Sequence, residues 1–324
     1  DGEFLLGPTE VKGFWVACAF CAHGLAGAGG IGKVMAEWII EGHPEWDMWH
    51  LDVRRFGTNY ASPEYILDRT IETYSKYYDI HYPGEERMTG RNLRLSPTYT
   101  RLRELGATFG EKTGWERVNF IKSYEGLARH GHEPKGWAHH NWSRAIGYEH
   151  LKTRETAALF DETSFNKFQV RGPGALGFLN QVCTNQIDRP VGTVVYTQCL
   201  NPRGGIECDF TVTRLEEERF LIITGTAYGQ HDSSWLRLNM PDDGSVTLED
   251  VTSKYACIGL WGPKARQILG KVTQADISNE GFPYMTARQL TIGSIPVLAC
   301  RVTYVGELGW EFYCPMEYGL QLWD

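Results

Sequence analysis

Two runs of strand-forming residues flank a cluster of turn-forming residues in the second half of the chain. Residues 201–205 read N-P-R-G-G, in which proline presets φ and glycine accepts positive φ at little cost. β-Branched and aromatic residues occupy 194–196 before this cluster and 210–213 after it. We therefore expect two antiparallel strands joined by a tight loop, and the surrounding fold must accommodate this hairpin.

Side chains alternate between the two faces of the second strand. Cys208 and Phe210 point to one face, whereas Asp209 and Thr211 point to the other. A carboxylate on this strand has two interpretations. It lies on a solvated sheet face, or it is held against a ligand whose approach the glycine turn permits. The alternation alone leaves both open.

Size and charge exclude several classes of protein. The 324 residues suffice for two domains and a connector, and 11 Trp, 16 Tyr and 14 Phe can fill a large core. The net charge is about −8 with both signs interspersed, so nucleic acid and membrane are not expected partners. No apolar run in the sequence is long enough to span a bilayer, and no signal peptide is recognisable.

The eight cysteines are scattered, mostly within apolar runs, which indicates free buried thiols in a reducing compartment. Cys18 and Cys21 form a C-x-x-C spacing without a second pair at zinc spacing. We interpret them as part of a core strand and predict no metal site. The sequence has no initiator Met and starts and stops within patterned segments, so we expect an excerpt truncated at both ends.

The first 42 residues predict a strand, a glycine-rich loop and a helix. Residues 13–20 form an unbroken apolar run typical of a fully buried strand. Ile31, Val34 and Trp38 share one face of a helix that should end at Gly42. The glycines between them spell G-x-G-x-x-G, but no strand ending in an acid follows, so a dinucleotide fingerprint is a weak interpretation. A helix N-terminus behind a glycine loop can still approach an anionic ligand.

An internal repeat lies in the second half of the chain. Residues 170–182 are echoed by 260–272, with Gly, Pro, Ala, Leu and Val at equal offsets. In each copy a strand runs into Gly-Pro, which we expect to begin a helix at its first position. The repeat predicts a pseudo-symmetric domain of two halves with a site between them.

Two motifs in the second half of the chain are G-G-I-E-C-D, ending at Asp209, and Y-V-G-E-L-G-W-E at 304–311. Together they resemble the folate-binding core of the glycine-cleavage T-protein and of the dimethylglycine and sarcosine dehydrogenases. The resemblance implies that Asp209 lies beside the reacting nitrogens of tetrahydrofolate, with Thr211 nearby. It also implies that Tyr304 packs on the folate and Glu311 hydrogen-bonds the pterin, and we assign Tyr313 to the same site.

The N-terminal segment resembles the last glycine turn of the flavin domain in the same family. The resemblance implies FAD contacts by a continuous segment, with the dinucleotide fingerprint itself lying upstream. That segment comprises His23, Gly24, Leu25, Ala26, Gly27, Ala28, Gly29 and Gly30. His23 is either a flavin neighbour or a residue that caps the loop.

We therefore predict an α+β chain of three parts. Residues 1–53 are the C-terminal tail of an FAD-binding α/β domain, 54–145 a connector, and 146–324 a T-protein-like folate domain lacking its C-terminal part. In the connector we expect a helix over 63–78 capped by Ser62, and aromatic residues that join the domains without chemistry.

The resemblance implies FAD-dependent oxidative N-demethylation of a small methylated amine of the dimethylglycine or sarcosine type. The one-carbon unit would pass to tetrahydrofolate, with Asp209 as general base, made more basic by partial burial beside Phe210. An electron-transfer flavoprotein is an expected partner. The expected location is the bacterial cytoplasm or the mitochondrial matrix. Two alternatives stay open: a catalytically silent relative of the pyruvate dehydrogenase phosphatase regulatory subunit, and a plain aminomethyltransferase.

Overall fold

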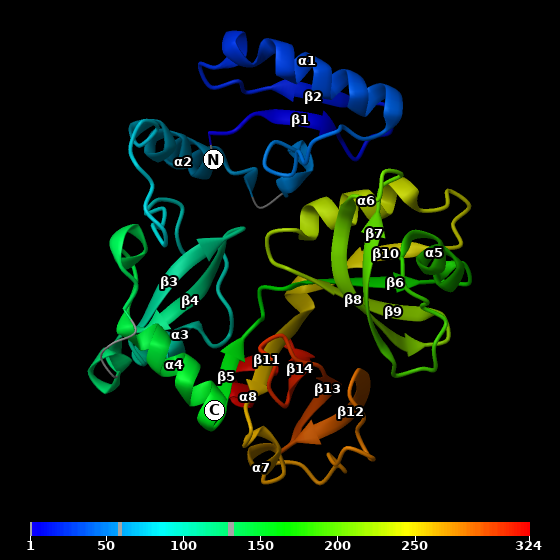
Figure 1. Cartoon of the computed structure of the whole chain (residues 1–324). Coiled ribbons are helices and arrows are strands. Elements are labelled where there is room, and N and C mark those ends of the chain that lie inside the picture. Colours follow the sequence, from blue (N-terminus) through cyan, green and yellow to red (C-terminus); the bar gives the residue numbers. More distant parts are fainter. Residues whose placement is uncertain (1, 58–59, 129–132) are drawn as a thin grey trace.

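The computed structural model describes residues 2–57, 60–128 and 133–324. An N-terminal unit contains a two-stranded ribbon and one long helix, α1, that packs on it (Figure 1). Its elements are β1 (Leu5–Pro8), β2 (Trp15–Cys18), α1 (Gly24–Glu41) and the 3-10 turn η1 (Val53–Arg55). Leu6, Val34 and Trp38 form its small core. The helix ends as predicted at Gly42, which has φ 83° and donates its N–H to the Trp38 carbonyl.

Three predictions for this unit are wrong. The expected buried strand at 13–20 is the short β2, which is half-buried at Trp15 and exposed at Cys18, because only β1 pairs with it in the described chain. Cys21 is also exposed, so the C-x-x-C pair is not core. The expected glycine loop is helical from Gly24 onward. Each glycine costs about 1 kcal/mol of helix propensity, and packing of the apolar stripe on the ribbon overrides that cost.

The connector contains helices and a hairpin. Helix α2 begins at Pro63, with Ser62 Oγ accepting from the Tyr65 N–H as predicted, and ends three residues earlier than the predicted 78. The hairpin of β3 and β4 lies in a part of the connector for which the sequence analysis predicts only aromatic contacts between domains. The elements of this part are α2 (Pro63–Ser75), α3 (Tyr99–Glu104), β3 (Ala107–Lys112), β4 (Trp115–Ile121), η3 (Lys122–Leu127), η4 (Gly136–His139) and α4 (Arg144–Glu155).

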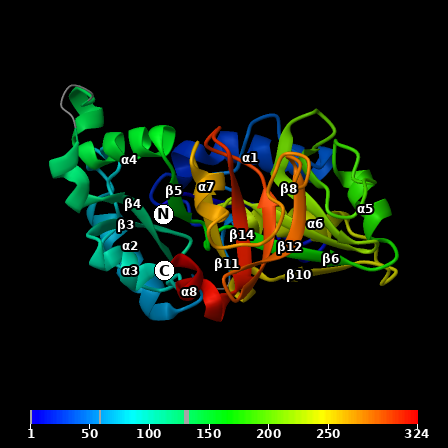
Figure 2. The ribbon, with the colours of Figure 1, turned by 90° about the horizontal axis from the view of Figure 1, so that it is seen from below.

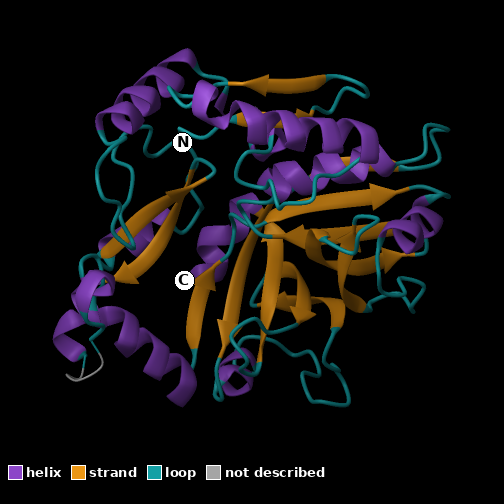
Figure 3. Ribbon diagram, turned by 45° about the horizontal axis from the view of Figure 1, so that its top comes forward, coloured by secondary structure: helices purple, strands orange, loops and turns teal. Residues whose placement is uncertain are grey.

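Two five-stranded sheets make up the rest of the chain (Figure 3). The first sheet has the order β10-β6-β9-β8-β7, and the second has the order β12-β13-β14-β11-β5. The first contains β6 (Asn166–Arg171), β7 (Val194–Leu200), β8 (Ile206–Glu216), β9 (Arg219–Thr224) and β10 (Thr247–Asp250). The second contains β5 (Ala158–Asp161), β11 (Tyr255–Trp261), β12 (Thr286–Ile292), β13 (Ile295–Arg301) and β14 (Gly309–Pro315).

The two sheets confirm the α+β class and show the symmetry that the repeat predicts. Read from opposite ends, the two strand orders match, with β6 equivalent to β11 and β8 equivalent to β13. Strand β5 precedes the first half in sequence but pairs with β11 of the second. The intervening elements are α5 (Ala175–Val182), α6 (Gly229–Asn239), η5 (Thr252–Lys254), α7 (Ala265–Leu269), η6 (Met316–Tyr318) and α8 (Gly319–Trp323).

The repeated Gly-Pro pair lies before each helix rather than at its first position. Helices α5 and α7 begin at Ala175 and Ala265, and the pair makes the preceding turn. Gly172 and Gly262 have φ of 120° and 139°, and a Cβ at Gly262 would overlap the Thr156 carbonyl oxygen. Close approach of a second backbone segment therefore requires glycine at these turns.

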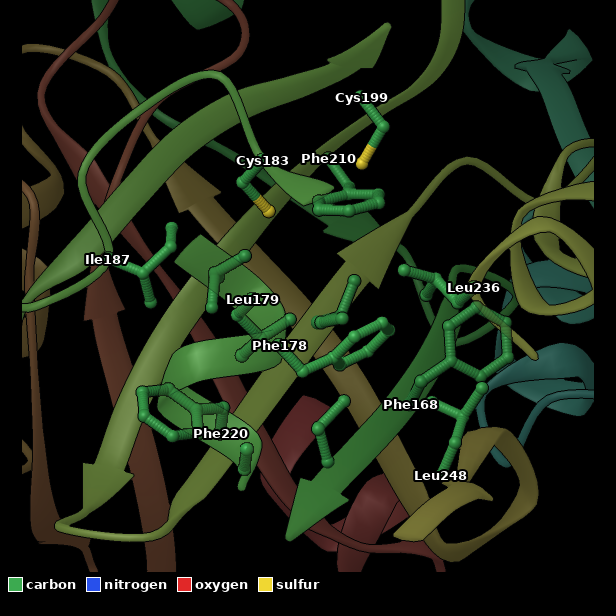
Figure 4. Packing of buried hydrophobic residues seen from close by; sticks show 14 of the residues in the cluster. Phe168, Phe178, Leu179, Cys183, Ile187, Cys199, Phe210, Phe220, Leu236 and Leu248 are labelled. Carbon is green, nitrogen blue, oxygen red and sulfur yellow. The ribbon is translucent and has the colours of Figure 1, made fainter. Parts of the chain in front are cut away.

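Three apolar clusters hold the sheets together. One covers the outer face of the first sheet with α5 and α6 (Figure 4), and one covers the outer face of the second with α7. The third contains Val194 and Ile223 of the first sheet together with Cys257, Cys300 and Tyr313 of the second, so the inner faces of the sheets contact each other. Figure 2 shows β12 and β14 of the second sheet, orange and red, against the first sheet, green to yellow. We call the space between these inner faces the inter-sheet space.

A buried cluster of charged residues joins the N-terminal unit to helix α6. Arg54 donates to Asp52 through Nε at 3.1 Å to both carboxylate oxygens and through Nη2 at 2.6 Å. His231 on α6 lies 3.6 Å from Asp52 Oδ2 and 3.7 Å from Glu207 Oε2, measured from Nε2. The Trp49 ring packs on Tyr228 of the same helix. This cluster contacts both parts at once.

Candidate functional site

The predicted hairpin is present and fixes the position of Asp209. Strands β7 and β8 pair antiparallel, with Gln198 opposite Asp209 and Tyr196 opposite Thr211. The loop between them contains Gly204 at φ 83°. Because residues opposite each other share a face, these four side chains all lie on one face of the first sheet.

That face is the inner one. Phe210 and Cys208, on the other face of β8, are both 2% exposed within the outer core. Thr211 lies opposite Ile223 on β9, and Ile223 lies opposite Lys167 on β6, so these three side chains share one face. Ile223 belongs to the cluster between the sheets, so Asp209 and Thr211 belong to the face that bounds the inter-sheet space.

Asp209 is held by two neighbours on β7. The Tyr196 hydroxyl donates to Oδ2 at 2.9 Å and the Gln198 side-chain amide donates to Oδ1 at 3.3 Å. The side chain is exposed and Phe210 points away from it, so the expected partial burial is not found. The hydrogen bond to Asp209 raises the pKa of Tyr196, and Tyr304 lies close enough to contribute to the same shift. Tyr304 therefore lies near Tyr196, the hydrogen-bond partner of Asp209.

Tyr304 lies in the loop between β13 and β14 and is 92% exposed. The backbone N–H groups of Gly306 and Glu307 donate to Thr303 Oγ1 at 2.9 and 3.1 Å, which folds this loop back on itself. The ring is therefore displayed on an ordered turn. An exposed aromatic face beside a carboxylate is the arrangement that a planar ligand can cover.

Glu311 and Tyr313 lie on the inner face of the second sheet. Glu311 pairs with Gly259 on β11 and Cys300 on β13, and Tyr313 pairs with Cys257. The Tyr313 hydroxyl donates to Glu311 Oε2. Burial raises the pKa of Glu311 above that of an ordinary glutamate and raises the pKa of Tyr313 well above that of an ordinary tyrosine.

Residues from both halves of the domain therefore lie on inner faces that are turned toward each other. The first sheet contributes Asp209 and Thr211 and the second contributes Glu311 and Tyr313, with Tyr304 on the loop that leads into β14. Carboxylates accept from ring N–H groups, and the aromatic rings offer faces for stacking. The space combines hydrogen-bond acceptors with apolar walls.

Sequence reasoning missed two polar residues beside this space, Glu162 and Lys167. Lys167 is fully buried on β6 and its Nζ donates to the carbonyls of Thr163 at 2.9 Å and Phe165 at 2.8 Å. Burial lowers its pKa to about 8. The available signal was a lysine inside the otherwise buried run N-K-F-Q-V.

The residues assigned to FAD form the N-cap and first turns of α1 in the N-terminal unit, whereas Asp209 lies on β8 of the first sheet (Figure 1). His23 is at the N-cap position without a side-chain capping hydrogen bond, and its ring stacks on Tyr77 at 5.5 Å between centroids. The loop-capping interpretation is thus not supported by a hydrogen bond. Leu25, in the first turn, is 95% exposed.

Other site types are absent from the residues that the structure describes. Among these residues no group of three or more His, Cys, Asp or Glu is arranged to hold a metal ion. No helix within the same ranges is both long and apolar enough to cross a membrane. A cavity of about 560 Å³ lies between the ribbon and helices α5 and α6, lined by Trp38, Arg54 and Glu207 among others, and Asp209 does not line it.

Comparison with known proteins gives two family matches and several relatives. The GCVT N-terminal domain family matches residues 98–324, and the FAD dependent oxidoreductase central domain family matches 41–96. The chain is 36% identical to 4-methylaminobutanoate oxidase (formaldehyde-forming) of Paenarthrobacter nicotinovorans, 33% to the pyruvate dehydrogenase phosphatase regulatory subunit of Mus musculus, and 32% to the dimethylglycine dehydrogenase of Homo sapiens.

These alignments cover 99–100% of this chain but only 36–39% of each relative, so the chain spans well under half their length. Among solved structures, the glycine cleavage system aminomethyltransferase T from Bartonella henselae superposes with a TM-score of 0.56 at 24% identity. The superposition covers 71% of this chain and 55% of that one. At this identity the likeness concerns the fold alone.

Proposed function

The chain belongs to the family that joins an FAD-dependent oxidoreductase to a GCVT domain, as the dimethylglycine and sarcosine dehydrogenases do, and from this premise we propose its function. The whole protein oxidatively demethylates a small methylated amine, and the GCVT part transfers the one-carbon unit to tetrahydrofolate. The main support is that Asp209 and Glu311, from separate halves of the domain, lie on the inner faces of the two sheets, which are turned toward each other.

Asp209 suits the role of general base. Oxidation of the amine removes a hydride from its methyl group and leaves an iminium carbon. A folate nitrogen attacks that carbon and must lose its proton, while the demethylated amine leaves. A carboxylate within hydrogen-bond reach can take the proton, a contribution typically worth about 10² to 10⁴ in rate. The hydrogen bonds from Tyr196 and Gln198 fix the orientation of this carboxylate.

The remaining residues suit binding of the pterin. Glu311 offers carboxylate oxygens to adjacent ring N–H donors, and its bond from Tyr313 fixes the rotamer. Tyr304 offers an exposed ring for stacking, and Thr211 lies beside Asp209 on the same face. Together these residues position a planar, donor-rich ring between the sheets.

The first turn of α1 fits one edge of a flavin site. Backbone N–H groups at a helix N-terminus lack helical partners and carry partial positive charge, and here the N-cap side chain makes no capping bond. Within the segment from His23 to Gly30, the N–H groups of Gly24, Leu25 and Ala26 would be presented to the flavin ring, where they stabilise negative charge. The chemistry that FAD supplies when bound is acceptance of the hydride, and an electron-transfer flavoprotein is the proposed onward acceptor.

Calorimetric titration of the intact protein with tetrahydrofolate tests the folate assignment, and we expect saturable binding. The product assay then follows dimethylglycine oxidation with and without tetrahydrofolate. We expect 5,10-methylenetetrahydrofolate in its presence and formaldehyde in its absence. A protein that shows no folate binding would refute the assignment.

A second candidate is a catalytically silent regulatory protein. It is favoured by the 33% identity to the mouse pyruvate dehydrogenase phosphatase regulatory subunit over the whole chain. Anaerobic addition of dimethylglycine or sarcosine to the flavin-loaded protein separates the two. Loss of the oxidised flavin absorbance supports the dehydrogenase, whereas an unchanged spectrum with both amines supports the silent relative. The FAD central-domain match at 41–96 argues against a plain aminomethyltransferase.

A further inference from the structure

Glu162 is a buried carboxyl group on the inner face of the second sheet. Its backbone N–H donates to the Cys257 carbonyl at 2.9 Å, which extends the pairing of β5 with β11 by one residue. Cys257 pairs with Tyr313, and the neighbouring Gly259 pairs with Glu311. Glu162 therefore shares the inner face with Glu311, diagonally across β11, where Gly259 contributes no side chain.

The carboxyl group of Glu162 has an unused acceptor. The residue is 8% exposed, and its Oε2 has no hydrogen-bond partner among the residues that the structure describes. Buried polar atoms in proteins are nearly always paired, so an unpaired carboxylate oxygen on the inner face that also carries Glu311 points to a donor supplied by a ligand.

Several charged groups interact electrostatically with Glu162, and some of them already form hydrogen bonds with other residues. The titratable groups that interact electrostatically with it are Glu311 on β14, Lys167 on β6, Cys257 on β11, Arg117 on β4, and the adjacent Asp161. Lys167 is bonded to two backbone carbonyls, and Asp161 accepts from the hydroxyls of Ser96 and Thr98.

Burial raises the pKa of Glu162 well above that of an ordinary glutamate, and repulsion from Glu311 raises it further. Burial raises the pKa of Glu311 as well. Two neighbouring carboxyl groups in a poorly solvated space resist ionising together. The pair therefore tends to retain one proton when no ligand donates to it.

We propose that Glu162 is a second ligand-binding carboxyl of the folate site, which accepts from a ring edge with adjacent N–H donors and releases its proton when that edge binds. The 2-amino-4-oxopyrimidine edge of a reduced pterin has this chemistry. The inference rests on the proposed folate function. It adds to that function one further binding residue and the release of a proton on binding. The proton passes to solvent, and no bond to carbon changes.

Titration calorimetry of the intact protein with tetrahydrofolate, in two buffers of different ionisation enthalpy at pH 7, measures proton release directly. We expect the wild type to release up to one proton per folate. Glu162→Gln keeps the size of the side chain but cannot titrate, so we expect about tenfold weaker binding and no proton release. Glu149→Gln is the matched control, since burial also raises the pKa of Glu149 on α4, where it accepts from the Ile121 N–H.

Wild-type affinity and wild-type proton release in Glu162→Gln would overturn the proposal. Folate binding without proton release by the wild type would overturn it and leave the folate function intact, whereas no folate binding at all would refute both. An infrared difference spectrum of the wild type, recorded with and without folate, tests the same deprotonation without a substituted protein. Loss of a protonated carboxylic acid C=O band on folate addition is expected, and its absence would also count against Glu162.

Discussion

Asp209 differs from an ordinary exposed carboxylate in the two side chains that hold it. Tyr196 and Gln198 bind one carboxylate oxygen each, and both come from the neighbouring strand β7. An aspartate bound in this way loses little rotamer freedom when a ligand arrives. Its exposure then gives a folate nitrogen direct access to the base.

Asp209→Asn should separate the two half-reactions of the whole protein. The amide cannot take up the folate proton, so we expect formation of 5,10-methylenetetrahydrofolate to fall by about 10² to 10⁴ while flavin reduction by the amine is unchanged. Stopped-flow flavin absorbance and a coupled folate assay measure these rates separately. Glu218→Gln, in the exposed β8–β9 turn, is the charge-matched control. Equal losses in both half-reactions would contradict the role of Asp209.

Lys167 gives a pH-dependent prediction. Its pKa falls from 10.5 to about 8 in the folded protein, so between these values the unfolded chain binds a proton that the folded chain does not. The free energy of unfolding therefore rises with pH across this window. The cost of burying Lys167 is fully present below about pH 8 and is lost as the pH rises toward 10.5. At about 1.4 kcal/mol per pH unit the wild type should gain up to about 3 kcal/mol relative to Lys167→Met.

Urea unfolding of the wild type and Lys167→Met at pH 7.5 and 10.5 measures that gain. The comparison between the two proteins cancels the titration of retained residues that do not interact with Lys167. Parallel pH profiles would show that Lys167 keeps an ordinary pKa in the folded state.

The sequence predicts some of the site residues and not others, for a physical reason. Period-two alternation places Asp209 and Phe210 on opposite faces, and the structure agrees. Glu162 and Lys167 become neighbours of Glu311 only because β5 crosses to the second sheet and the two sheets stack. Alternation identifies the face of a strand but not the sheet that it joins.

At the level of elements, the repeated Gly-Pro turns mark equivalent points of the two halves. The prediction of a pseudo-symmetric pair of strand-and-helix units is confirmed by the matching strand orders. Helix α1 was less predictable. Its five glycines favour a loop by propensity, and only the ribbon, brought against its apolar stripe by the tertiary fold, makes the helix stable.

Gly262→Ala should be strongly destabilising. A Cβ at this position would overlap the backbone of Thr156 and Ala157 in addition to adopting φ 139°, so we expect a loss of about 3 kcal/mol or more. Gly244→Ala is the control, because Gly244 has φ 77° but no atom within 4 Å of an added Cβ. It should cost about 1 kcal/mol. Denaturant unfolding gives both values, and similar losses would mean that φ alone sets the cost.

At the scale of the whole molecule, the N-terminal unit and the GCVT part are joined by contacts of very different strength. Asp52 and Arg54 are 2% and 7% exposed and lie against His231 of α6. The ion pair between Arg203 and Glu41 also connects the two parts, but 44% and 47% of its side-chain surface is exposed. Exposed pairs contribute at most about 1 kcal/mol, whereas an unpaired buried charge is costly.

Asp52→Ala should therefore uncouple the two parts, because it leaves the Arg54 guanidinium buried beside His231 without its carboxylate. We expect a loss of about 3 to 5 kcal/mol, against less than about 1 kcal/mol for Arg203→Ala. Hydrogen–deuterium exchange measures where the loss falls. Peptides from β1, β2 and α1 should lose protection in Asp52→Ala while those from β6, β8 and β9 keep it. Uniform loss across both parts would instead mean that they unfold as one unit, and unchanged protection would mean that the buried pair does not join them.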